Sequence, residues 1–403
     1  MEQTQTQTQT LTMPAVSWNR LATTAVAHMT EHLYVGVTTM ALPVIASAMG
    51  LSMAQAGSLV STRYLVAGLA NIPSGFLADL IRRRNVLLGS CLVFLGLGSL
   101  LMSFAPSFWP LLVFMAVGGL GAGSFHPQSL AILSSAYRER RALALGVHDS
   151  AANLGEVIAP LTIGALLTYT DWRTTLQIWA APGLVVGLSY ALFCPEVNRS
   201  LNRGGRLKKL LWQDVVKNRD VLVMFFVSVF RTLGQSALTV FLPLYLTLHL
   251  KLSVGAMGFY ISTLFLFAGI APTFSGWVSD RIGRVLLIVI GSALTALSVV
   301  ALPHLSPGIP LGIGCGMVGG LLWAVRPVVF AAAMEMAPPE LAGTLVGFFY
   351  SGNMGLSFLA PILAGLVADA YGLPAAVTFI GIFPLLACVV PLGLLRGRAV
   401  QPV

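Results

Sequence analysis

The sequence predicts an all-α integral membrane protein whose twelve transmembrane helices form two six-helix bundles related by pseudo-two-fold symmetry. Of its 403 residues, 56% are hydrophobic and only 9% are charged, whereas soluble chains carry roughly 25% charged residues. The mean hydropathy is +0.85, and long apolar segments recur along the whole chain. A soluble enzyme is therefore excluded. The net charge of +9 is interpreted as a sign of membrane orientation rather than of nucleic-acid binding.

Each predicted helix is an apolar segment bounded by turn residues or charge clusters, and each reaches the roughly 20 residues needed to cross a bilayer. The first six are expected near residues 21–48, 54–78, 85–104, 108–135, 141–169 and 173–193. The second six are expected near residues 220–248, 255–278, 285–304, 308–335, 341–369 and 374–395. We therefore expect a disordered tail (1–17), a first bundle (18–195), a linker (196–219), a second bundle (220–396) and a C-terminal tail (397–403).

The positions of the basic residues predict how these helices are oriented. Of the 23 Lys and Arg residues, 18 fall on one face of the predicted topology and two, Arg173 and Lys251, on the other. The remaining three, Arg63, Arg231 and Arg326, fall within helices. Lys and Arg accumulate in cytoplasmic loops. We therefore expect a multi-pass protein of the inner (cytoplasmic) membrane with both termini and the central loop in the cytoplasm.

The two halves of the sequence repeat one another. A shift of 201 residues aligns Asp79 with Asp280 and Arg83 with Arg284, and a shift of 200 aligns His126 with Arg326. A duplicated six-helix unit is typical of transporters, in which the substrate site lies near the midplane between the repeats.

Two loops at equivalent positions carry the most specific motif. GFLADLIRRR (75–84) and GWVSDRIGRV (276–285) both resemble the cytoplasmic signature loop of the major facilitator superfamily. Each glycine is expected to allow close backbone approach, and each aspartate to accept hydrogen bonds from nearby arginines. The first copy departs from the motif at Leu80 and Arg82. We expect a conformational latch formed by Gly75, Asp79, Arg83, Glu139, Gly276, Asp280, Arg284 and Glu335.

Shorter stretches resemble one branch of that superfamily. GAGSFHPQS (121–129) is similar to the Phe-His-Pro element of fosmidomycin-resistance-type efflux transporters, and AHMTEHLYVG is similar to their first helix. NLGEVIAPLTIG (153–164) resembles a degraded fifth-helix motif of drug/proton antiporters. The alternative for that last stretch is that its small residues permit close helix packing.

Ionisable residues within the predicted helices indicate the transport site, because they are costly in a bilayer unless they face an interior cavity. His28, Glu31 and His32 share one helical face, which suits the uptake and release of a proton. A second face carries Asp149, Asn153 and Glu156. The alternative for both faces is a fixed interhelical pair, for example with Arg63. The expected substrate- and proton-binding residues are His28, Glu31, His32, Arg63, His126, Asp149, Asn153, Glu156, Arg231, Trp323, Arg326 and Tyr350.

These features predict a secondary active transporter, not an enzyme, working by alternating access and exporting a small organic or drug-like solute in exchange for protons. One alternative is a proton-coupled uptake symporter for an organic anion, with Arg63, Arg231 and Arg326 as counter-ions. Another is a transport-inactive membrane sensor. The cysteines show no ligand spacing, so we expect no metal and no cofactor besides the proton gradient. The expected partners are a small-molecule substrate and the lipid bilayer, without nucleic acid, and the chain is expected to be a monomer.

Overall fold

The computed structural model describes residues 18–80, 83–137, 140–195, 217–338 and 342–397, and the regular structure in these ranges is helical. The first half of the chain forms six helices that each cross the molecule once. They are α1 (Trp18–Met49), α2 (Met53–Leu80), α3 (Arg84–Ser103), α4 (Phe108–Ala136), α5 (Arg141–Tyr169) and α6 (Trp172–Phe193).

The second half also makes six crossings, but several of them consist of more than one helical segment. The first four are α8 (Arg219–Leu244) with the π-turn η2 (Tyr245–His249), α9 (Val254–Ile282), α10 (Arg284–Ala301) with the short η3 (Leu302–His304), and α11 (Ile309–Glu335). The last two are α12 (Ala342–Ser357) with α13 (Leu359–Tyr371), and α14 (Leu373–Ile380) with α15 (Ile382–Val389) and α16 (Leu392–Gly397).

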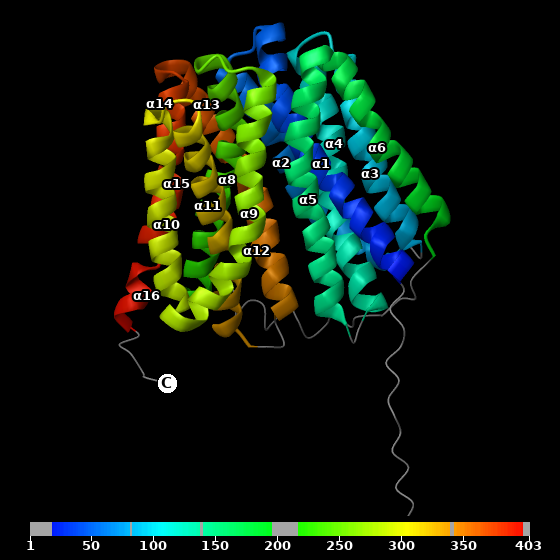
Figure 1. Cartoon of the computed structure of the whole chain (residues 1–403). Helices are drawn as coiled ribbons and strands as arrows, with labels where there is room; N and C mark the ends of the chain where they lie inside the picture. The colour runs from blue at the N-terminus through cyan, green and yellow to red at the C-terminus, as the bar shows by residue number, and fades with distance from the viewer. Residues whose placement is uncertain (1–17, 81–82, 138–139, 196–216, 339–341, 398–403) are drawn as a thin grey trace, which may run out of the picture.

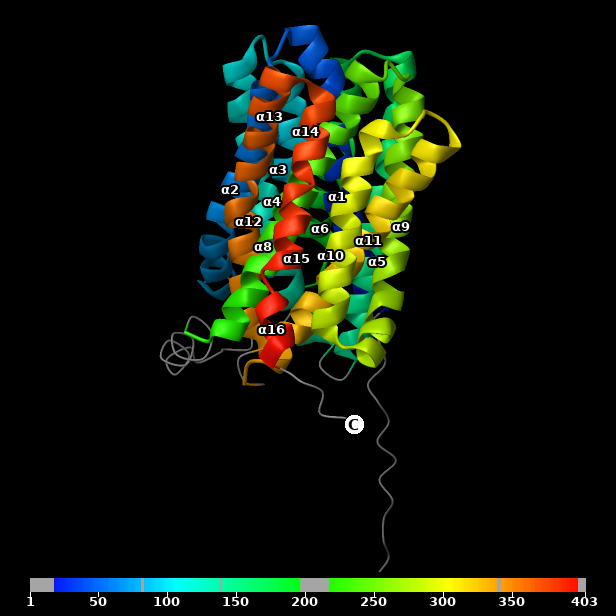
Figure 2. The same cartoon turned by 90° about the vertical axis from the view of Figure 1, so that its left-hand side faces the viewer.

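The twelve predicted crossings are confirmed. Eleven helical spans in the described ranges are long and apolar enough to cross a membrane, and α2, which carries the buried Arg63, is the twelfth. Figure 1 shows the two halves as neighbouring bundles, and Figure 2 shows the same arrangement from the side. The first helix begins and the last helix ends at the same end of the molecule, as an even number of crossings requires.

The crossing expected near 341–369 is interrupted between α12 and α13, before Pro361. A proline has no N–H, so the carbonyl four residues earlier loses its helical partner. That carbonyl belongs to Ser357, and it accepts a hydrogen bond of 3.0 Å from the Ser236 hydroxyl of α8. A neighbouring helix therefore satisfies the freed backbone group, as membrane helices require.

The two bundles are joined at the end of the molecule away from the termini. The Asp369 carboxylate of α13 accepts hydrogen bonds from the backbone N–H groups of Met53 (2.7 Å) and Ala54 (2.9 Å) in the first turn of α2. A carboxylate at this position interacts favourably with the helix dipole. The Ser61 hydroxyl of α2 donates to the carbonyl of Phe358 at 2.6 Å. These contacts cap α2 of one bundle with the chain of the other.

A second contact between the bundles joins α5 to α9. The Ser262 hydroxyl donates to the carbonyl of Val157 at 2.9 Å, and a Cβ atom at Gly258 would lie only 2.6 Å from the carbonyl oxygen of Pro160. This contact also lies in the part of both helices away from the termini. We call the α2–α13 and α5–α9 contacts together the seal.

Candidate functional site

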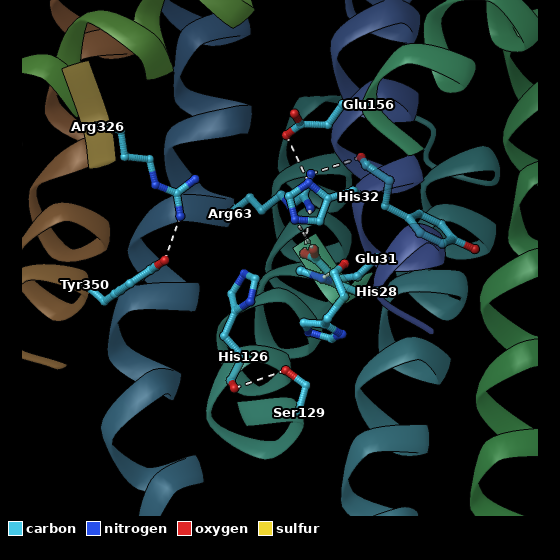
Figure 3. Close-up of polar contacts among 11 residues, drawn as sticks. His28, Glu31, His32, Arg63, His126, Ser129, Glu156, Arg326 and Tyr350 are labelled. Atoms are coloured by element: carbon cyan, nitrogen blue, oxygen red, sulfur yellow. Dashed lines mark hydrogen bonds and ion pairs between the residues drawn. The ribbon is translucent and has the colours of Figure 1, made fainter. Parts of the chain in front are cut away.

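Polar and charged side chains from both bundles converge in the middle of the molecule (Figure 3). In the first bundle, His32 of α1 lies between two carboxylates. Its Nδ1 atom is 2.9 Å from Oε1 of Glu156 on α5, and its Nε2 atom is 3.4 Å from Oε2 of Glu31. The structure therefore joins Glu156 of the second predicted face to the first predicted face in a single cluster.

Three more histidines, His28, His126 and His148, complete this cluster. The Nδ1 atom of His28 lies 2.9 Å from the backbone carbonyl oxygen of His148, and the two imidazole rings stack with centroids 3.8 Å apart. His126 of α4 places its ring 5.4 Å from that of His28 and 6.1 Å from that of His32. We refer to His28, Glu31, His32, His126, His148 and Glu156 as the histidine cluster.

Close packing of α5 on α1 brings the cluster together. A Cβ atom at Gly155 would lie 2.5 Å from the backbone carbonyl oxygen of Met29, a distance that real Cβ atoms essentially never show. A residue with a side chain would push the helices apart at the turn where His32 meets Glu156. The packing interpretation of the 153–164 stretch therefore accounts for Gly155, and Gly164 makes a looser approach to α9.

Arg63 of α2 is fixed within the first bundle. Its guanidinium lies 3.9 Å from the Glu31 carboxylate and donates to the carbonyl of Tyr34 at 3.0 Å and, at 3.5 Å, to the Thr38 hydroxyl. The side chain is buried. Of the two roles expected from the sequence, pairing with Glu31 is the one that this geometry supports, rather than holding an anion in the cavity.

Arg231 and Arg326 of the second bundle have a different environment. Arg231 is buried, with 4% of its surface exposed, and donates to the side chains of Gln235 (2.8 Å) and Thr232 (3.0 Å). Arg326 donates to the Tyr350 hydroxyl at 2.6 Å. Neither arginine forms an ion pair with an acidic side chain in the described part of the chain.

The two groups face each other across the boundary between the bundles. Figure 3 shows Arg326 and Tyr350 on one side and the histidine cluster on the other. The rings of Tyr350 and His126 are 6.4 Å apart, and Arg326 lies within electrostatic range of Glu156. Asp149 of α5 is exposed and attracts both Arg326 and His126 electrostatically.

The two remaining predicted site residues lie elsewhere. Trp323 is buried and packs edge to face on Phe265, with ring centroids 5.7 Å apart, so its visible role is to pack α11 on α9. Asn153 is half-buried and packs near Gly269 of α9. A substrate contact for either residue stays a prediction.

The second signature loop brings three of the predicted latch residues together. The Arg284 guanidinium lies 3.1 Å from the Asp280 carboxylate and also pairs with Glu335, which links the start of α10 to the ends of α9 and α11. The expected close approach at Gly276 is wrong, because a Cβ atom there would meet open space. The glycine that the loop requires is Gly283, whose φ of +93° lies in the region that side-chain-bearing residues rarely adopt.

The first signature loop is only partly visible. Gly75 and Asp79 lie near the end of α2 and Arg83 is exposed just before α3. The side chain of Asp79 and the whole of Glu139 lie outside the described residues.

Sequence reasoning missed several residues that shape the site. His148 was visible only as a neighbour of Asp149, and its stacking on His28 depends on the packing of α5 against α1. Gln235 lies one helical turn after Arg231, and this i, i+4 spacing was a signal for their hydrogen bond. Asp369 gave no signal, because its partner is a helix N-terminus in the other bundle.

Two bundles with a polar site between them define a membrane transporter built from a repeated unit. A family model described as Major Facilitator Superfamily matches residues 24–247 and 224–403. The chain therefore belongs to the major facilitator superfamily, whose members are transporters, and it is a multi-pass membrane protein.

The proteins that are similar to this chain include transporters whose names refer to different compounds. The chain is 24% identical over 382 residues to the fosmidomycin resistance protein of Escherichia coli (strain K12), covering 93% of this chain and 92% of that protein. It is 26% identical over 337 residues to the gentisate transporter of Corynebacterium glutamicum, covering 80% and 75%. The expected similarity to fosmidomycin-resistance transporters is confirmed.

Solved structures share the fold at low sequence identity. A bacterial homolog of the human lysosomal transporter Spinster, in an inward-facing and unoccupied conformation, matches with a TM-score of 0.81 at 17% identity, covering 96% of this chain and 99% of that chain. A D-xylose-proton symporter matches with a TM-score of 0.77 at 13% identity, covering 93% and 96%. At these identities the likeness establishes the fold alone.

Proposed function

We propose that this protein is a proton-coupled secondary transporter, working by alternating access, whose substrate is a small organic anion. We infer the substrate class from the pair Arg231 and Arg326. Both guanidiniums belong to membrane-spanning helices near the boundary between the bundles, and their hydrogen bonds in the described structure go to neutral groups.

A pair of cations at this depth favours a negatively charged ligand. Removing a charge from water costs several kcal/mol unless an opposite charge offsets it, and charged residues inside a membrane usually face a functional cavity. A carboxylate between the two guanidiniums would offset both charges and accept their planar hydrogen-bond donors. Arg63 is not part of this proposal because it already pairs with Glu31.

The proton-coupling part of the proposal is supported by the histidine cluster. His32 contacts both Glu31 and Glu156, and Figure 3 shows these groups across the boundary from Arg326. A change in charge on one side of the boundary alters the electrostatic potential at the other. Protonation of the cluster makes it more positive and favours anion binding, so this electrostatic link supports coupling to protons. Export against a proton flow further requires that the anion and the proton bind in different conformations.

For the direction of transport, we propose export, because relatives whose names refer to drug resistance align with most of this chain. The gentisate transporter, named for a carboxylate, supports the substrate class. Uptake by symport is the alternative that the transport assay below distinguishes. We further propose that the protein lies in the inner membrane with both termini cytoplasmic, because most of its Lys and Arg residues fall on one face of the topology. We also propose that it is a monomer.

Ligand-induced stabilisation tests the substrate class. The purified protein is heated with a panel of small carboxylates, each paired with its neutral amide of the same shape. A ligand that binds only the folded state raises the melting temperature, with a stabilisation of about 2.7 kcal/mol at one hundred times Kd. We expect stabilisation by some carboxylates and not by their amides. Equal stabilisation by both members of each pair would contradict the anion proposal.

A further inference from the structure

We propose that His28, Glu31, His32 and His126 form a binding site for a divalent transition-metal ion, represented by Zn²⁺. One nitrogen or carboxylate oxygen of each residue lies within 4.8 Å of those of the other three. No metal was expected from the sequence, because its cysteines show no ligand spacing. The fold brings His126 of α4 to the three residues of α1. Glu31 and His32 also belong to the proposed proton-coupling site, so a bound ion would compete with a proton there. The experiment measures metal binding directly, so its failure would leave the proposed anion transport untouched.

The first argument is the orientation of His28. Its Nδ1 atom lies 2.9 Å from the carbonyl oxygen of His148. Because a carbonyl only accepts hydrogen bonds, Nδ1 carries the proton and Nε2 presents a lone pair. Only 3% of the residue is exposed, and Nε2 has no hydrogen-bond partner in the described part of the chain. A buried acceptor without a partner is costly, and a bound metal ion would supply the missing interaction.

The second argument is the orientation of His32. Its Nδ1 atom contacts the Glu156 carboxylate at 2.9 Å, while Nε2 points to Oε2 of Glu31 at 3.4 Å. Metal-binding histidines almost always donate the N–H away from the metal to a carboxylate or a carbonyl, which fixes the ring and its tautomer. His28 uses a carbonyl and His32 a carboxylate, so both rings are held in the way that this rule requires.

The donor set indicates the kind of metal. Three imidazole nitrogens and one carboxylate oxygen suit Zn²⁺, Co²⁺ or Ni²⁺ rather than Mg²⁺ or Ca²⁺, which prefer oxygen ligands. In a four-coordinate site with bonds of about 2.0–2.2 Å, ligand atoms lie about 3.4 Å apart. The ligand atoms, which lie within 4.8 Å of one another, therefore have to close by up to about 1.4 Å, which rotation of the half-buried His32 and His126 side chains would provide.

The charges around the site are compatible with a divalent ion. Oε1 of Glu31 faces Arg63 at 3.9 Å, which leaves Oε2 for the metal. Glu156 supplies a second negative charge next to His32 and balances Arg63. The His32 side chain is 18% exposed, and His126 faces the second bundle across Tyr350. An ion would enter from the boundary between the bundles.

The test measures Zn²⁺ binding to the full-length protein, purified in detergent with an affinity tag that contains no histidine. The chain has six histidines. Competition with a chromogenic chelator is expected to give one Zn²⁺ per chain, and Co²⁺ is expected to give the visible absorption bands of a four-coordinate nitrogen and oxygen site. His28→Gln and His126→Gln should each weaken binding more than tenfold, and Glu156→Gln should weaken it about 10- to 100-fold.

His304→Gln is the matched control, because His304 lies in η3, outside the cluster. This variant should bind Zn²⁺ like the unmodified protein. Each variant is first checked for a single folded species by size-exclusion chromatography. If the His28 and His126 variants do not fold, the Co²⁺ spectrum of the unmodified chain and the Glu156→Gln affinity decide. Absence of the Co²⁺ bands, no Zn²⁺ binding, or unchanged affinity in the folded cluster variants would overturn the proposal.

Discussion

Arg231 and Arg326 differ from the other membrane arginine, Arg63, in what surrounds their guanidiniums. Arg63 is matched by the Glu31 carboxylate, whereas the other two donate to an amide and to hydroxyl groups. All three were equivalent counter-ion candidates in the sequence, because their helical positions give no information about partners on other helices. The side-chain contacts separate one structural ion pair from two candidate ligand-binding cations.

Arg326 is expected to contribute directly to the affinity for the anionic ligand. We expect Arg326→Gln to weaken binding of the anionic ligand about 10- to 100-fold, because hydrogen bonds to charged groups contribute about 1.5–3 kcal/mol. Arg326→Lys should recover part of the affinity, since it keeps the charge but loses the planar donors. Titration of the ligand against the melting temperature measures both effects. The control is Arg281→Gln, which changes an exposed arginine on α9. An equal loss of affinity in that variant would show that Arg326 does not bind the ligand specifically.

Glu31 and Glu156 carry the prediction about coupling. Glu31→Gln keeps the size of the side chain and removes its charge, so we expect gradient-driven accumulation to fail while exchange of substrate between the two sides of the membrane continues. Glu156→Gln should have the same effect if the two carboxylates act together through His32. Counterflow of radiolabelled substrate in proteoliposomes separates exchange from accumulation. Undiminished accumulation in Glu31→Gln would show that Glu31 does not carry the proton.

The close packing of α5 on α1 uses glycines from both helices, Gly155 of α5 and Gly36 of α1. Gly155→Ala places a methyl group 2.5 Å from the carbonyl oxygen of Met29, so the helices must separate, at a cost of about 1–3 kcal/mol for overpacking. Thermal unfolding in detergent should show a lower melting temperature. Gly146→Ala, in the same helix but with nothing within 4 Å of its added Cβ atom, should change stability little. Equal destabilisation by both variants would mean that helix packing at Gly155 is not the cause.

The seal gives a second prediction at this scale. Asp369→Ala removes the acceptor for two N–H groups in the first turn of α2, and Ser61→Ala removes the hydroxyl that reaches Phe358. We expect both variants to favour separation of α2 from α13. Spin labels placed near the ends of these helices, away from the termini, would report a larger population of long distances. An unchanged distance distribution in the double variant would mean that other contacts hold this end closed.

The helices were predictable because each is a long apolar segment with a clear boundary. The interruptions of the helices could not be predicted. At the break before Pro361, the freed carbonyl of Ser357 accepts a hydrogen bond from the Ser236 hydroxyl, which belongs to another helix. The seal was equally hidden, because the partner of Asp369 is a set of backbone N–H groups. Contacts between distant backbone and side-chain atoms leave no periodic pattern in the sequence.

At the scale of the whole molecule, the internal repeat predicted the most about the site. It aligned His126 with Arg326, and the fold places both near the boundary between the bundles, on opposite sides (Figure 3). The repeat did not predict that the Glu31 and Glu156 faces meet at His32, since this depends on the distance between two helices of one bundle. The positions of the charged residues in the sequence therefore predicted where the site lies. Helix packing divides the site into the histidine cluster and the pair Arg231 and Arg326.

The hydrogen bonds between the bundles described above lie away from the termini. If the termini are cytoplasmic, as proposed, the closed end is the external one, and alternating access requires the seal to open while the opposite end closes. Arg284, held by Asp280 and Glu335 at the terminal end of the second bundle, would then keep α9, α10 and α11 moving as one body.

Transport of a carboxylate by the reconstituted protein tests the central claim most directly. Proteoliposomes containing the protein are loaded with a carboxylate from the stabilisation panel, and its movement is followed with and without a pH gradient, beside its neutral amide. The account predicts that the carboxylate leaves the cytoplasmic-side compartment faster when protons flow the opposite way, and that the amide is not carried. Carboxylate movement in the same direction as the protons would support uptake by symport instead of export by antiport. Movement that is independent of the pH gradient, or equal for the carboxylate and the amide, would contradict a proton-coupled anion transporter.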